Sequence, residues 1–127
     1  MTEAEMTGTE QAGQPGRLSV VSTASDSIHV ITLNGEVDHQ TGEPLRQALQ
    51  QTAAAAPGAQ VVVDLRGVGF MDSTGINILI SAHHDLTKSG GWLRLAAPTP
   101  PVLRVLHLVG VNAVIDCRDT LAQALAP

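Results

Sequence analysis

Aromatic residues are almost absent from this chain of 127 residues, which has one Phe, one Trp and no Tyr. So few rings argue against an aromatic stacking platform for single-stranded nucleic acid. The single cysteine, Cys117, excludes an internal disulfide and a cysteine-based zinc site. Basic residues are also scarce, since seven Lys and Arg stand against twelve Asp and Glu, giving a net charge of −5. Nucleic-acid binding relies on clustered Lys and Arg side chains, so nucleic acid is disfavoured as a partner.

No apolar run of the sequence approaches the roughly 18 residues that a membrane span requires. Residues 1–16 contain Glu but neither Lys nor Arg, and they have no apolar segment. A secretory signal would have both basic residues and an apolar segment. We therefore expect a cytoplasmic protein that binds neither nucleic acid nor a membrane. The three Glu, three Gly and one Pro of residues 1–16 predict a disordered acidic tail, and residues 17–127 are long enough for one domain.

What the chain does contain is a regular alternation of strand-like and helix-like segments. Two β-branched runs flank a polar turn at 25–27 and predict an N-terminal hairpin. Apolar spacing and Gly or Pro punctuation then predict strands and helices in turn. The strands are expected at 18–21, 28–33, 61–65, 92–95 and 113–115, and the helices at 40–55, 72–89, 100–110 and 120–125. The prediction is an α/β fold with a mixed four- to five-stranded sheet and about four helices packed over it.

The most informative segment runs from Phe70 to Ile76. It places Ser73 and Thr74 at a predicted helix start, beside Asp72 and after a buried strand. One interpretation is that these side chains merely cap the helix by accepting hydrogen bonds from free backbone N–H groups. The other is that the helix start accommodates a phosphate on Ser73, which would add a charge of about −1.5 to −2. The two interpretations are compatible.

The segment VVVDLRGVGFMDSTG at 61–75 resembles the signature of anti-sigma factor antagonists, which are STAS-domain proteins. In that family a D-S-[ST]-G motif begins a helix and its first Ser is phosphorylated, which corresponds to Ser73 here. Three further segments are similar to family motifs and follow in the same order: GEVDH at 35–39, SGG at 89–91 and LRVLHLVG at 103–110. The resemblance covers roughly residues 17–125, and it implies a single STAS-like domain.

The resemblance implies a protein switch that is not an enzyme and needs no cofactor. Its unphosphorylated form would bind an anti-sigma factor that is itself a serine kinase and release the sigma factor, in stress response or sporulation. Phosphorylation of Ser73 would end the interaction, and a phosphatase would restore it. The protein itself would be a monomer or a weak homodimer. The alternative is a constitutive STAS interaction module, a scaffold or transport-complex accessory, in which Ser73 only caps the helix.

Four residues beside Ser73 are candidate partner-binding residues: Asp38, Asp72, Thr74 and Gly75. Asp38 would lie near Ser73 and orient its hydroxyl or contact the partner. Equally, Asp38 can be a helix-entry residue that accepts hydrogen bonds from backbone N–H groups.

Enzymatic and metal sites are disfavoured. A hydrolase built from Ser73, His83 or His84 and Asp72 would need Gly at position 71, where Met71 stands. Adjacent helix residues point about 100° apart, so the neighbouring His pair does not form a metal site. We expect no catalytic residue and no metal, and we interpret Arg66 and Arg94 as solvated surface or partner contacts.

Overall fold

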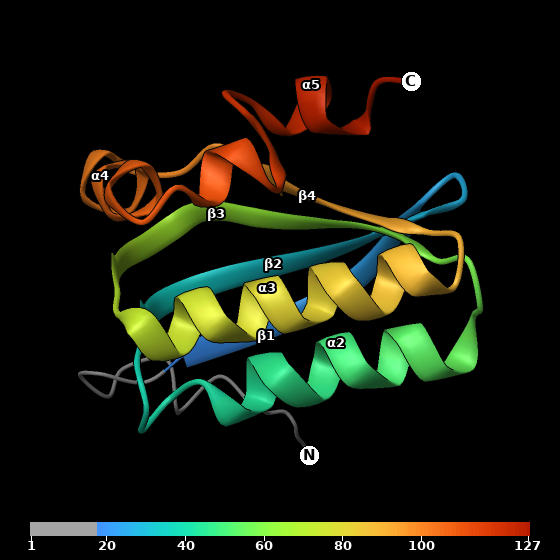
Figure 1. Ribbon diagram of the computed structural model, residues 1–127, viewed down its shortest axis with the longest axis horizontal. Coiled ribbons are helices and arrows are strands. Elements are labelled where there is room, and N and C mark those ends of the chain that lie inside the picture. Colours follow the sequence, from blue (N-terminus) through green and yellow to red (C-terminus); the bar gives the residue numbers. More distant parts are fainter. Residues whose placement is uncertain (1–17) are drawn as a thin grey trace, which may run out of the picture.

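Figure 1 shows the computed structural model, which describes residues 18–127. The predicted acidic tail at 1–16 lies outside the described residues. As the sequence predicts, a hairpin is followed by alternating helices and strands. The elements are β1 (Leu18–Ser25), β2 (Ile28–Val37), α2 (Glu43–Ala55), β3 (Gln60–Met71), α3 (Ser73–Lys88), β4 (Trp92–Ala96), α4 (Pro100–Leu108), the 3₁₀ helix η2 (Val111–Ala113), β5 (Asp116–Arg118) and α5 (Leu121–Leu125).

The five strands of the described part form one mixed sheet in the order β1-β2-β3-β4-β5. β1 and β2 pair antiparallel through a turn in which Asp26 adopts a φ of 56°, a left-handed conformation that Asp tolerates. All other neighbouring strands are parallel, so the carboxyl ends of β2 and β3 meet at one edge, where Val37 is paired with Met71. The α/β prediction with a mixed sheet is confirmed.

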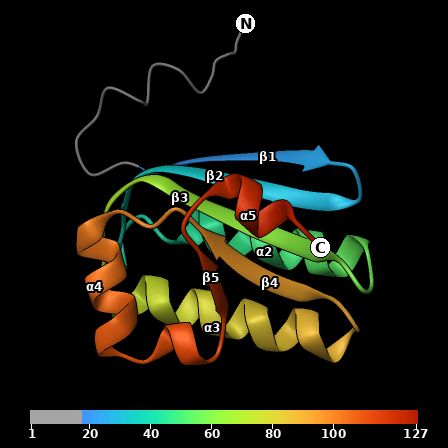
Figure 2. The same ribbon diagram turned by 90° about the horizontal axis from the view of Figure 1, so that it is seen from above.

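Helices lie on both faces of this sheet. α2 and α3 run side by side over one face, whereas α5 lies on the other and α4 lies at one end (Figures 1 and 2). β3 is buried on both faces, because Val61, Val63 and Leu65 pack in the main core while Val62 packs with Ala124 of α5. A strand covered on both faces reads as a continuous apolar run, as 61–65 does.

The prediction of a last strand at 113–115 is wrong. Gly110, with a φ of 77°, ends α4 and the chain continues into η2, where the Val111 carbonyl accepts hydrogen bonds from the N–H groups of Val114 and Ile115. The apolar residues of this segment therefore belong to a helical turn. The strand follows it as β5, which pairs Asp116 with Arg94 of β4.

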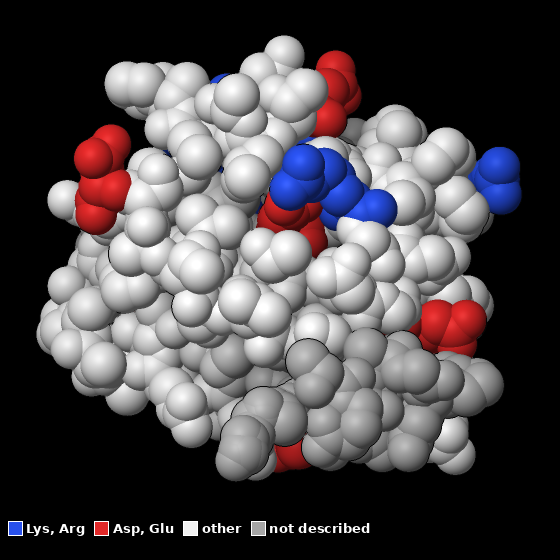
Figure 3. Space-filling model, turned by 180° about the vertical axis from the view of Figure 1, so that it is seen from behind, with Lys and Arg blue, Asp and Glu red and all other residues white. Residues whose placement is uncertain are grey.

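Two arginines that we interpreted as surface or partner contacts have structural roles within the chain. Arg94 stacks on Trp92 at 4.0 Å, and its Nη1 donates to the carbonyls of Ala124 and Ala126 at 2.9 and 2.8 Å. Arg66 donates from Nε and Nη2 to the carboxylate of Asp64, which is fully buried. A buried carboxylate needs such a partner, and the two-pronged guanidinium supplies it. On the face of the molecule seen from behind, charged side chains are few and scattered (Figure 3).

Candidate functional site

The candidate site lies at the edge of the sheet where β2 and β3 both end. The pairing of Val37 with Met71 brings the last residues of these strands together. Just beyond them, the backbone N–H of Asp72 donates to the Val37 carbonyl at 3.1 Å. This hydrogen bond joins the last residue of β2 to the residue before α3, so the sequence motifs at 35–39 and 61–75 meet here.

Asp72 caps α3. Its backbone is extended, and its Oδ1 accepts hydrogen bonds from the N–H groups of Thr74 and Gly75 at 2.9 and 3.4 Å. Such a cap stabilises a helix by about 1 kcal/mol. The capping interpretation is therefore confirmed for Asp72. Ser73 is the first residue of α3 and is exposed, so its hydroxyl lies on the surface at the helix start.

The same cap changes the expectation for a phosphate at this helix start. The N–H groups of Thr74 and Gly75, which would attract an anion, already bond to the carboxylate of Asp72. A phosphate on Ser73 would therefore share the helix start with an existing negative charge. The phosphate would add hydration and repulsion toward the Asp72 carboxylate, rather than occupy an empty anion site.

Two glycines allow the close contacts that build the site. Gly75 is buried, and a Cβ added there would lie 2.7 Å from Met71 Cγ and 2.8 Å from Val37 Cγ1. At Gly42 an added Cβ would lie 2.9 Å from both the Asp38 carbonyl oxygen and Ile78 Cδ1. The absence of a side chain thus lets α3 sit directly on the strand ends and lets the loop 38–42 pack against the first two turns of α3.

Asp38 forms its hydrogen bonds within its own loop. Its Oδ1 accepts from the N–H groups of Gln40 and Thr41 at 2.9 and 3.0 Å, and Thr41 Oγ1 lies 2.7 Å from the Glu36 carbonyl oxygen. Desolvation raises the pKa of Asp38, but the backbone hydrogen bonds from Gln40 and Thr41 outweigh it and the pKa is lowered. The helix-entry interpretation of Asp38 describes these contacts, and Gly42 brings its loop against α3.

The sequence interpretation missed Thr41 and Gly42, because it began the helix at 40–41. α2 begins at Glu43, with Pro44 in its first turn. Pro is common in the first turn of a helix, because the N–H groups there have no acceptor within the helix and the missing N–H of Pro costs no hydrogen bond. The motif Thr-Gly-Glu-Pro at 41–44 was therefore the available signal that 38–42 is a structured loop.

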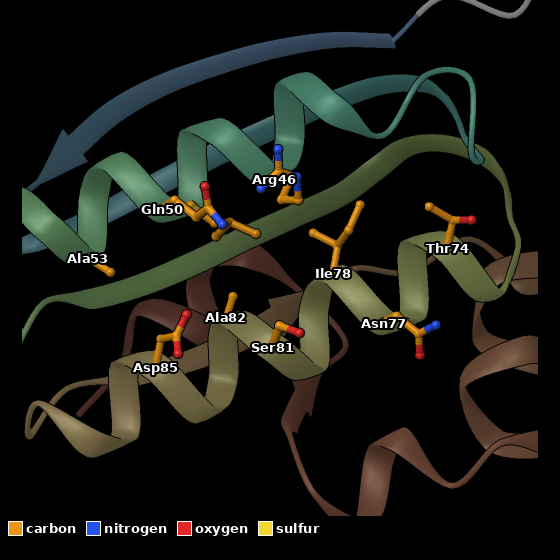
Figure 4. A pocket seen from close by; sticks show the side chains of 10 residues that line it. Arg46, Gln50, Ala53, Thr74, Asn77, Ile78, Ser81, Ala82 and Asp85 are labelled. Carbon is orange, nitrogen blue, oxygen red and sulfur yellow. The ribbon is translucent and has the colours of Figure 1, made fainter.

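A cavity of about 300 Å³ lies between α2 and α3, and Thr74, the residue after Ser73, is at its lining. Figure 4 shows Thr74 and Ile78 of α3 pointing toward α2 across it. This volume is at the small end of the range for ligand pockets. Both apolar and polar side chains line it: Arg46, Leu49, Gln50, Ala53, Thr74, Asn77, Ile78, Ser81, Ala82 and Asp85. The surface that begins at the start of α3 is thus hollowed and offers both kinds of contact.

Comparison with known proteins identifies the family. The sequence model of the STAS domain matches residues 19–124. This chain belongs to the STAS domain family. The resemblance seen in the sequence motifs is therefore confirmed, as is the fold.

Relatives of this STAS domain include the anti-sigma F factor antagonist of Paenibacillus polymyxa, 26% identical over 77% of this chain and 84% of the relative. The anti-sigma-F factor antagonist RsfB of Mycobacterium tuberculosis H37Rv is 28% identical over 87% of this chain and 89% of RsfB. Among solved structures, an anti-sigma factor antagonist from Mycobacterium paratuberculosis is similar with a TM-score of 0.81. It is 30% identical and covers 88% of this chain and 94% of that one.

The described part of this STAS domain contains neither the Ser73–His83 pair of a hydrolase nor a metal cluster. Ser73 and His83 lie ten residues apart in α3, which is about 15 Å along the axis, so they cannot share a hydrogen bond. Within residues 18–127 no three His, Cys, Asp or Glu side chains gather to hold a metal ion. No helix of this described part is long and apolar enough to cross a membrane.

Proposed function

We propose that this STAS domain is an anti-sigma factor antagonist switched by phosphorylation of Ser73. Its unmodified form binds an anti-sigma factor that is also a serine kinase, and the bound sigma factor is released. The kinase transfers the γ-phosphoryl group of ATP to Ser73 Oγ, which ends the interaction, and a phosphatase removes it. One observation supports this most directly: an exposed serine begins α3 next to a capping carboxylate, in a chain whose relatives are named antagonists.

The charge at the start of α3 explains how the switch works. As a neutral hydroxyl, Ser73 lets a partner approach the helix start closely. A phosphate adds about −1.5 to −2 charge. Because Asp72 already occupies the N–H groups of Thr74 and Gly75, these two donors are not free to bind that charge, which also repels the neighbouring carboxylate. Bringing it into a protein interface would also require its desolvation.

The neighbouring residues have separate parts in this proposal. Asp72 and Gly75 hold the start of α3 against the strand ends, so that Ser73 is presented at a fixed position. Thr74 lines the cavity and offers its side chain to the partner. Asp38 shapes the loop that packs beside α3, and that loop forms the second part of the docking surface.

Incubation with ATP and each anti-sigma kinase encoded by the same organism tests this function. We expect one kinase to add a single phosphate, observed as a mass increase of the intact protein, and peptide fragmentation to place it on Ser73. Ser73→Ala is expected to accept none, whereas Thr74→Ala is modified like the unaltered protein. The adjacent hydroxyl thus serves as the matched control.

Two results would contradict the proposal. One is a phosphate that still appears on Ser73→Ala, which would place the modification elsewhere. The other is stable binding of a partner together with no phosphorylation by any of these kinases. That outcome would favour the constitutive STAS interaction module, in which Ser73 only begins the helix.

A further inference from the structure

Phe70, the single Phe of the chain, is exposed although it lies in the central strand. The exposed fraction of Phe70 is 46%, whereas that of its neighbour Met71 is 2%. Met71 points toward α3, where its Cγ would lie 2.7 Å from a Cβ at Gly75. Since side chains alternate along a strand, Phe70 points to the other side of β3.

The end of β3 projects beyond its neighbour. β4 pairs with β3 only as far as Asp64, whereas β3 continues to Met71 and pairs there with β2 alone. Figure 1 shows β3 running past the end of β4 before the chain turns into α3. At Gly69 an added Cβ would meet no atom within 4 Å. Thr99, just before α4, covers part of this extension, because its Oγ1 donates to the Val68 carbonyl at 2.6 Å. Beyond that contact, at Gly69 and Phe70, the strand is open to a partner.

Phe70 and Ser73 lie at the same edge of the sheet. They are three positions apart in the chain, so the fully extended chain limits the distance between their Cα atoms to roughly 11 Å. Among the described residues the other large exposed apolar side chains are in β1 or in the segment from α4 to β5: Val21, Leu108, Val109 and Val114. Phe70 thus combines exposed aromatic surface with a position next to the proposed switch residue.

We propose that Phe70 is the anchor of the anti-sigma factor interface. Its burial by the partner increases the loss of binding affinity that a phosphate on Ser73 causes. This inference rests on the proposed function. The partner presents an apolar pocket that encloses the ring, as aromatic anchors at the centre of interfaces typically require. Closing that pocket excludes water from the neighbouring surface, which includes Ser73. A hydroxyl tolerates the loss of water, but a phosphate does not.

This mechanism predicts that the effects of Phe70 and of charge at Ser73 are coupled. A double-mutant cycle measures such coupling. The dissociation constant of the anti-sigma kinase identified by the phosphorylation experiment is measured calorimetrically for the unaltered protein, Phe70→Ala, Ser73→Asp and the double variant. We expect Phe70→Ala to weaken binding about tenfold or more, as truncation of a central aromatic does. In the Ser73→Asp background, the same truncation should weaken binding less than about threefold, because the pocket no longer closes there.

Matched variants separate this role from a general effect on the fold. Leu108 is also an exposed apolar residue, with a 79% exposed fraction, and Leu108→Ala should change the dissociation constant less than about twofold. Phe70→Leu keeps most of the apolar area and should bind within about threefold of the unaltered protein. Unfolding in urea checks that each variant is folded.

The outcomes also separate this inference from the proposed function. If Phe70→Ala binds like the unaltered protein while Ser73→Asp does not, Phe70 is not the anchor, although the switch remains. If both substitutions weaken binding independently, the idea that burial of Phe70 increases the effect of the phosphate is wrong. If Ser73→Asp has no effect, the proposed function itself fails.

Discussion

Ser73→Asp is expected to weaken binding of the anti-sigma kinase on the order of 100-fold or more. Introducing a charge into a desolvated interface costs about 2–5 kcal/mol when no partner group compensates for it. Asp72 makes compensation difficult, because its carboxylate already bonds to the N–H groups of Thr74 and Gly75. Titration calorimetry at fixed salt concentration measures the dissociation constant.

Matched substitutions make this prediction specific to the start of α3. Ser73→Ala should bind about as tightly as the unaltered protein, because a neutral small side chain is retained. Thr87→Asp adds the same charge to an exposed position in the last turns of the same helix and should change binding less than about twofold. Equal weakening by Thr87→Asp and Ser73→Asp would mean that overall charge, not the position of Ser73, controls the interaction.

Gly75→Ala is expected to lower the free energy of unfolding by about 1–2 kcal/mol. The added methyl group would lie 2.7 Å from Met71 Cγ and 2.8 Å from Val37 Cγ1, closer than Cβ atoms pack in proteins. Overpacking of a core costs about 1–3 kcal/mol, and the better helix propensity of Ala returns up to about 1 kcal/mol. Urea denaturation should show a lower midpoint with an unchanged slope.

Gly69→Ala is the control for this substitution. A Cβ at Gly69 would meet no atom within 4 Å, so its unfolding free energy should change by less than about 0.5 kcal/mol. A Gly75→Ala variant as stable as the unaltered protein would contradict the tight seating of α3 on the ends of β2 and β3.

The elements beside the site were the most predictable from the sequence. Asp72 before Ser73 is a local capping signal, and the apolar run 61–65 signals a strand buried on both faces. Both depend on residues close together in the chain. The capped helix start at Asp72 could therefore be predicted from the sequence, whereas the exposure of Ser73 is known from the structure.

Features that depend on distant contacts could not be predicted in this way. One local feature was also missed: residues 113–115 are apolar like a strand, but the hydrogen bonds from the N–H groups of Val114 and Ile115 to the Val111 carbonyl make the segment a helical turn. Arg94 is a charged residue, yet it bonds to carbonyls some thirty positions further along. The exposure of Phe70 depends on where β4 stops pairing with β3, which no local pattern reveals.

Displacement of a sigma factor is the decisive test of the switch at Ser73. A labelled sigma factor is bound to the purified anti-sigma kinase, and unmodified or Ser73-phosphorylated protein is added at increasing concentration. We expect the unmodified protein to release the sigma factor, as followed by fluorescence anisotropy, and the phosphorylated protein to need a concentration on the order of 100-fold higher for the same release. Equal release by the two forms would mean that a phosphate on Ser73 does not switch the interaction.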